Sequence, residues 1–103
     1  MFIYKIKLKI VQSREDDWLL WMTTEHLPKI IDTHYFLSCL FLKLLETPEI
    51  SYSSYEIQCV SESHSQIVQY ETTELRLMHE LLKKFGKEIK DIQRGIYKIM
   101  PSI

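Results

Sequence analysis

The chain has 103 residues, 46% of them hydrophobic and 26% charged, which suffices for one compact core, so we expect a single domain over residues 1–103. With 13 basic against 14 acidic side chains, no overall charge would attract nucleic acid or an anionic membrane surface. Two glycines exclude a Gly-rich phosphate loop, and no apolar run is long enough for a membrane helix.

The N-terminal residues alternate with lysine and therefore lack the continuous apolar stretch of a signal peptide. The only two cysteines, Cys39 and Cys59, form neither a disulfide scaffold nor a metal-ligand pattern such as C-x-x-C. We therefore expect a cytoplasmic protein with reduced thiols, without a bound cofactor or metal, and with neither a nucleic acid nor a membrane as partner.

Strict alternation of polar and apolar residues over 2–11 predicts a half-buried first strand. Ser13 and the acidic residues after it are typical of a helix start, and Pro28 should kink this helix because Thr24 loses its amide partner. The range 35–45 is apolar at both alternating sets of positions, which favours a strand covered on both faces over a helix.

A break at 46–49 and a second alternating run over 52–60 predict a hairpin that brings Cys39 and Cys59 close to opposite each other. Ser63 begins another capping pattern, and apolar residues at helical spacing predict a helix up to Gly86. The range 88–100 mixes isoleucines with charged residues and predicts a final strand.

This order predicts an α+β fold, a ferredoxin-like βαββαβ antiparallel sheet with two helices on one face. The other face would be left bare, although the strand over 35–45 carries apolar residues on both sides. A second copy of the chain is the simplest cover, because most soluble oligomers are symmetric homo-oligomers. We therefore expect a homodimer with an apolar rim near residues 36–45 and a polar centre.

The helix segment Trp18-Leu19-Leu20-Trp21-Met22 runs into Glu25-His26-Leu27-Pro28 between the first strand and the strand at Phe36, and this arrangement resembles the dimeric α+β barrel superfamily. The superfamily includes antibiotic-biosynthesis monooxygenase-like, ethyl tert-butyl ether degradation-like and haem-degrading proteins, and the chain resembles a bacterial subgroup of undescribed function. The resemblance spans the chain and implies two face-to-face sheets with a cleft near the first helix. The haem-degrading members share an Asn–Trp–His set, but this sequence contains no asparagine, so their chemistry is not implied.

His26 is the candidate catalytic residue, because an imidazole beside Trp21, Met22 and Pro28 could carry a proton or anchor a ligand near physiological pH. The alternative is a structural histidine that a backbone carbonyl satisfies. The four histidines show no i, i+4 pair at ligand spacing, so a metal site is not expected.

Trp18 and Trp21 are candidate ligand-binding residues that could wall an apolar pocket together with Tyr4, Phe36 and Phe41. Core packing is the alternative, because aromatic residues at helical and strand spacing usually just bury area.

The row Lys5, Lys7 and Lys9 should lie on the sheet's open face, toward the expected second copy. Three ammonium groups cannot stay unpaired in a dry interface. Either Glu56 and Asp91 neutralise them, or the centre is wet and binds a small anionic ligand.

The RNA-recognition motif shares this topology, but the second hairpin strand lacks that motif's aromatic pattern. Neither cysteine has a neighbouring histidine or helix start that would make it a nucleophile.

Taken together, these patterns predict a homodimeric module that binds a small apolar or anionic molecule or another partner. The alternative is a cofactor-independent monooxygenase- or isomerase-like enzyme acting around His26.

Overall fold

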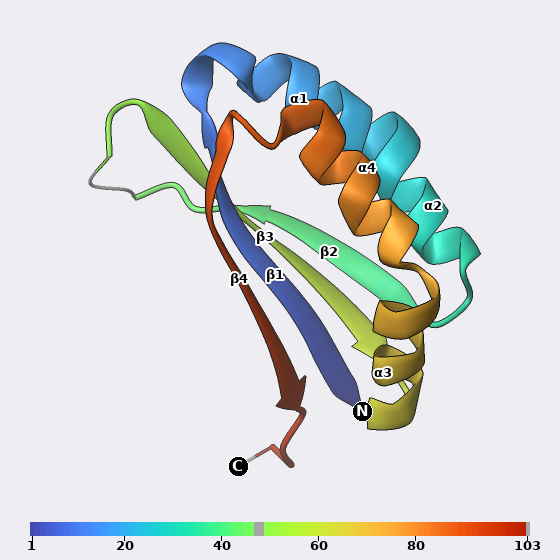
Figure 1. The fold of residues 1–103 in the computed structure, drawn as a ribbon. Coiled ribbons are helices and arrows are strands. Elements are labelled where there is room, and N and C mark those ends of the chain that lie inside the picture. The colour runs from blue at the N-terminus through green and yellow to red at the C-terminus, as the bar shows by residue number, and fades with distance from the viewer. Residues whose placement is uncertain (47–48, 103) are drawn as a thin grey trace.

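A single four-stranded sheet carries a layer of helices on one face in the computed structural model, which describes residues 1–46 and 49–102 (Figure 1). The elements in chain order are β1 (Phe2–Val11), a 3₁₀ turn (Gln12–Arg14), α1 (Glu15–Trp21), a π-helix (Met22–His26), α2 (Leu27–Asp32), β2 (Ser38–Lys43), β3 (Tyr52–Ser61), α3 (His64–Thr73), α4 (Leu75–Phe85) and β4 (Ile89–Lys98).

The strands are ordered β2-β3-β1-β4 and every neighbouring pair is antiparallel. All the helices lie on one face and the other face is open, as Figure 1 shows. This arrangement confirms the predicted α+β, ferredoxin-like fold. Across the described residues, no helix is both long and apolar enough to cross a membrane.

The first strand follows its sequence pattern closely. Tyr4, Ile6, Leu8 and Ile10 are buried against the helices. The lysines between them point to the open face, because successive side chains of a strand alternate. Each buried aliphatic side chain of this set contributes about 1.5–3 kcal/mol relative to an exposed one.

The second predicted strand is shorter than its apolar run, since β2 covers only 38–43. Phe36 precedes it and is buried in the core, whereas Leu40 and Leu42 are exposed on the open face. The apolar residues of 35–45 thus serve two places, because some are buried in the core and others lie on the uncovered face of the sheet. The predicted loop at 46–49 includes residues 47 and 48, which lie outside the described residues.

The predicted helix over 63–86 is divided at Glu74, whose φ of −115° and ψ of 31° are not helical. Its start is as expected, because the side chain of Ser63 accepts a hydrogen bond from the amide of Gln66. Before the break, the hydroxyls of Thr72 and Thr73 donate back to the carbonyls of Val68 and Gln69. Such threonine hydrogen bonds weaken a helix slightly, and here they lie in the last turn before the break.

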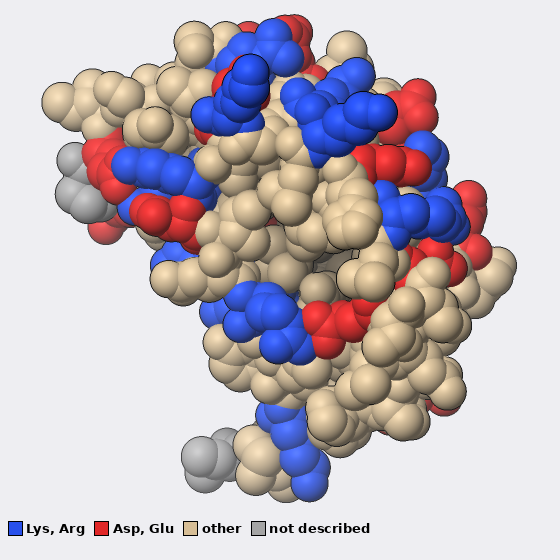
Figure 2. Space-filling view, viewed as in Figure 1, with Lys and Arg blue, Asp and Glu red and all other residues tan. Residues whose placement is uncertain are grey.

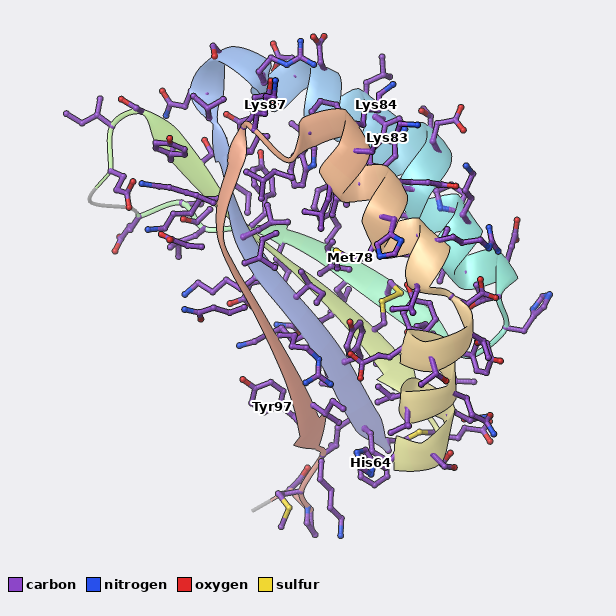
Figure 3. All side chains as sticks on the ribbon, in the orientation of Figure 1. His64, Met78, Lys83, Lys84, Lys87 and Tyr97 are labelled. Atoms are coloured by element: carbon purple, nitrogen blue, oxygen red, sulfur yellow. A yellow bond between two sulfur atoms is a disulfide. The ribbon has the colours of Figure 1, made fainter. Side chains whose placement is uncertain are left out.

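The expectation of reduced thiols is wrong, because Cys39 and Cys59 form a disulfide (Figure 3). Their predicted opposition is confirmed, since they are direct cross-strand partners with Cα atoms 4.0 Å apart. This register places both sulfur atoms on the helix-covered face. The register was predicted correctly, and the error lay in expecting a pair of cysteines without a scaffold pattern to stay reduced.

Candidate functional site

A cavity of about 380 Å³ lies between the sheet and the helices. In Figure 2 it is visible as a hollow whose rim carries basic and acidic side chains next to each other. Its volume falls within the range of small-molecule sites. Its walls are mainly aliphatic and aromatic, and the lining residues are Tyr4, Ile6, His26, Ile30, Ile57, Cys59, Tyr70, Glu71, Glu74, Leu75, Met78, Leu81, Leu82, Ile92 and Arg94.

His26 reaches the cavity because the first helical segment contains a wide turn. Trp18, Met22, His26 and Ile30 are all buried and lie four residues apart. In a regular α-helix each four-residue step advances by about 400°, so this row would drift by about 40° per step away from the sheet. The π-helix over 22–26 takes up the drift, with the amide of Leu27 donating to the carbonyl of Met22.

Pro28 lies in the first turn of α2, directly after this π-helix. It has no amide hydrogen for the carbonyl of Thr24, which was the reason to predict a kink. In the structure the helix is not broken at this point, because the π-turn accommodates the missing hydrogen bond. Such turns recur at functional sites in helices, and here the turn carries His26.

The imidazole of His26 is buried, with 3% of its surface exposed, and it stacks on Trp21 at a centroid distance of 4.9 Å. Burial lowers the pKa of His26 to about 4, while the nearby Glu80 acts in the opposite direction and Lys29 in the same direction. The ring is therefore neutral at physiological pH. Its Nδ1 has no hydrogen-bond partner among residues 1–46 and 49–102.

Tyr4 and Tyr70 line the same cavity and meet edge to face, with ring centroids 5.8 Å apart. Burial, reinforced by the charge of Glu71, raises the pKa of Tyr4 to about 12. Burial likewise raises the pKa of Tyr70 above that of a free phenol. Both hydroxyls therefore remain protonated at physiological pH and can donate hydrogen bonds.

An ion pair at the rim connects α3 with β4. The Nε of Arg94 donates to Oε2 of Glu71 at 2.7 Å, and its Nη2 donates to Oε1 at 2.5 Å. This two-point geometry is the most specific that a guanidinium offers a carboxylate. The second rim carboxylate, Glu74, pairs with Nη2 of Arg76 at 2.8 Å.

The two tryptophans predicted to bind a ligand lie in different places, and neither lines the cavity. Trp18 does not line the cavity; it is fully buried in the core, edge to face with Phe41 at 5.5 Å and Tyr55 at 4.9 Å. Trp21 stacks on His26 and also packs on Phe85, with the ring centroids of Trp21 and Phe85 5.6 Å apart. It covers one face of the imidazole and is not among the cavity-lining residues.

The three lysines lie on the open face of the sheet, away from the cavity. Lys5 pairs with Glu56 at 3.9 Å, and Lys9 pairs with Asp91 at 3.3 Å and also with Glu49. Lys7 has no carboxylate within salt-bridge distance in the part of the chain that the structure describes. The lysine row and His26 therefore cannot belong to one site within a single chain.

Several cavity residues were not singled out from the sequence as site residues. Tyr70 and Met78 were recognised only as apolar positions of a helix, and Figure 3 shows Met78 between α4 and the sheet. Glu71 and Arg94 carried no signal, because a charged residue in an amphipathic segment usually faces solvent. The inward position of Arg94 follows from its register partner Ile6, which faces the helices. Within the described ranges, no three His, Cys, Asp or Glu side chains are grouped to hold a metal ion.

The model of one protein family, a domain of unknown function (DUF4286), matches residues 1–99. Among proteins with curated descriptions, none is significantly similar in sequence.

Solved structures share the fold at low identity. A Bacillus halodurans protein of the ethyl tert-butyl ether degradation family has a TM-score of 0.73 at 15% identity, over 97% of this chain and 100% of its own. A Bacillus cereus protein assigned by name to the antibiotic biosynthesis monooxygenases has a TM-score of 0.68 at 16% identity, over 99% and 95%. A dimeric ferredoxin-like protein from an uncultured marine organism has a TM-score of 0.64 at 13% identity, over 100% and 98%.

Proposed function

This chain belongs to the DUF4286 family, a domain of unknown function, and we propose that it is a homodimeric binding module that holds a small, largely apolar molecule in the cavity beside His26. The observation that carries the proposal is a cavity of about 380 Å³ whose wall includes a buried imidazole with a partnerless Nδ1. An unpaired polar atom inside a protein costs about 1–3 kcal/mol, and a ligand that hydrogen-bonds to it would recover part of that cost.

The polar groups of the cavity suit such a ligand. Small-molecule sites usually combine apolar walls with a few placed polar groups. Here the walls supply the apolar contact, and His26, Tyr4 and Tyr70 supply hydrogen-bonding groups from three different elements. We further propose a cytoplasmic location, which microscopy of the tagged protein would test.

A bulkier side chain in the cavity wall should weaken binding. The neutral fluorescent probe N-phenyl-1-naphthylamine should bind the unmodified protein, and Met78→Phe should weaken its binding by about tenfold or more, because the larger ring occupies ligand space. His79→Phe is the matched control, since His79 is exposed on the same helix and does not line the cavity. Unchanged probe affinity in a folded Met78→Phe protein would contradict the proposed site.

The open sheet face supports the dimer. Leu40 and Leu42 are 56% and 40% exposed there, and a solved structure described as dimeric shares the fold. Light scattering should give about twice the chain mass of 12.4 kDa, and Leu42→Glu should shift the protein toward monomer by burying a charge in the interface. Leu20→Glu, exposed on α1, should leave the mass unchanged. A monomeric unmodified protein at micromolar concentration would refute the dimer.

A second candidate is an enzyme without a cofactor, acting on the bound molecule. It is favoured by the position of His26 in the cavity wall, where its imidazole is in the unprotonated form that a general base needs, although its lowered pKa makes it a weak base. Two fold neighbours are named after a monooxygenase family and an ether-degradation family, and their sequence identities of 16% and 15% support a shared fold and no shared activity. Consumption of a bound compound by the unmodified protein, but not by His26→Phe, would favour this candidate.

A further inference from the structure

The basic side chain at the rim of the cavity, Arg94, is already paired with a carboxylate, that of Glu71, in the absence of a ligand. Arg94 directs two of its donors at the two oxygens of Glu71, and this hydrogen-bonded carboxylate is the main reason that the pKa of Arg94 is raised. Glu71 is only 25% exposed, so its carboxylate lies at the inner side of the pair. The guanidinium is therefore already occupied in the geometry that it would use to bind an anion.

Arg94 is the cation that an anionic ligand would meet in the cavity. Among the described residues that line the cavity it is the only lysine or arginine, whereas Glu71 and Glu74 both carry carboxylates. His26 is buried without a partner at Nδ1 and contributes a neutral ring. Moving an ionised group from water into an apolar cavity is costly unless a counter-charge and hydrogen bonds receive it.

We propose that the cavity selects neutral molecules over anions, and that Glu71 determines this selectivity by occupying Arg94. The inference rests on the proposed binding function and adds the chemical class of the ligand. The expected ligand has an apolar body and one or two uncharged hydrogen-bonding groups that reach His26 or the tyrosine hydroxyls. Removing the charge of Glu71 would leave the guanidinium of Arg94 free to receive an anion at the rim.

A pair of fluorescent probes tests this directly. N-phenyl-1-naphthylamine and 8-anilino-1-naphthalenesulfonate share one ring system and differ by a single sulfonate. The unmodified protein should bind the neutral probe about tenfold more tightly than the sulfonate probe. Only the binding that Met78→Phe removes is counted in this comparison. Glu71→Gln should strengthen sulfonate binding by about tenfold and change neutral-probe binding by less than about threefold.

Two further variants separate local from general charge effects. Glu62→Gln makes the same change in net charge at an exposed position outside the cavity, and it should not alter either affinity. Arg94→Gln leaves Glu71 without its cation, so sulfonate binding should weaken by about threefold or more. If Glu71→Gln does not fold, unchanged sulfonate binding in Arg94→Gln overturns the inference, because Arg94 would then have no part in the response to an anion.

The possible outcomes are distinct. Equal affinity of the unmodified protein for both probes overturns the inference and leaves the binding function standing. A gain in Glu71→Gln no larger than in Glu62→Gln overturns the role of Glu71. Failure of both probes to bind the unmodified protein overturns the proposed function together with the inference.

Discussion

Trp18→Ala should lower the free energy of unfolding by about 3–5 kcal/mol, measured by urea denaturation. The side chain is fully buried and packs edge to face against Phe41 and Tyr55, so truncation removes a large apolar group and leaves a cavity among aromatic rings. Leu20→Ala, two residues further along α1 and 66% exposed, should change the free energy by less than about 0.5 kcal/mol.

Trp18→Phe separates packing from ligand contact. It preserves an aromatic ring and removes an indole Nε1 that has no hydrogen-bond partner within the described part of the chain. Its stability loss should therefore be smaller than that of the alanine variant, and N-phenyl-1-naphthylamine affinity should stay within about threefold because Trp18 does not line the cavity. A tenfold loss of probe affinity in the folded phenylalanine variant would mean that Trp18 contacts the ligand after all.

Acidification should destabilise the protein through His26 by about 3 kcal/mol between pH 7 and pH 4. The pKa of His26 is about 4 in the folded protein against an ordinary value of 6.5, so the unfolded chain binds the extra proton first. This contribution is therefore complete above pH 6.5 and decreases as the pH falls toward about 4. Urea denaturation at half-unit pH intervals measures the slope.

His26→Phe is the informative variant, because it keeps a ring against Trp21 and cannot titrate. Its stability should depend less on pH over this window than that of the unmodified protein, by about 3 kcal/mol in total. Carboxylates also titrate at acidic pH, so the quantity to compare is the difference between the two proteins. His79→Gln removes an exposed histidine and should keep the full slope; identical slopes in all three proteins would contradict the burial of His26.

The topology followed from the sequence because its signals were local. Alternation over β1 and the capping serine Ser63 each report a backbone preference within a few residues, and these preferences added up to the correct order of strands and helices. The opposition of Cys39 and Cys59 was also predictable, since pairing outward from a hairpin loop sets the register. The disulfide was missed because two cysteines in a protein expected in the cytoplasm were taken to be reduced, although the predicted register already placed them opposite each other.

The site was only partly predictable, because a cavity is formed by elements distant in sequence. His26 stood out as a titratable group near tryptophans, but whether it faced the core depended on a π-turn. Arg94 and Glu71 are 23 residues apart on β4 and α3, and nothing in their local patterns indicates that they pair. The signal that could have placed His26 was its position in a four-residue row with Trp18, Met22 and Ile30. In a regular helix such a row drifts by about 40° per step, so its burial along the whole length requires a wider turn.

The wide turn before Pro28 makes the length of this segment a marker of the site. A family member with one residue fewer between the positions of Trp18 and Pro28 could continue as a regular α-helix up to its proline. Because the wide turn holds one residue more than an α-helical turn, the residues on both sides of the deletion would keep their orientation toward the sheet. Segment length should therefore separate relatives that have the wide turn at this place from relatives with a regular helix.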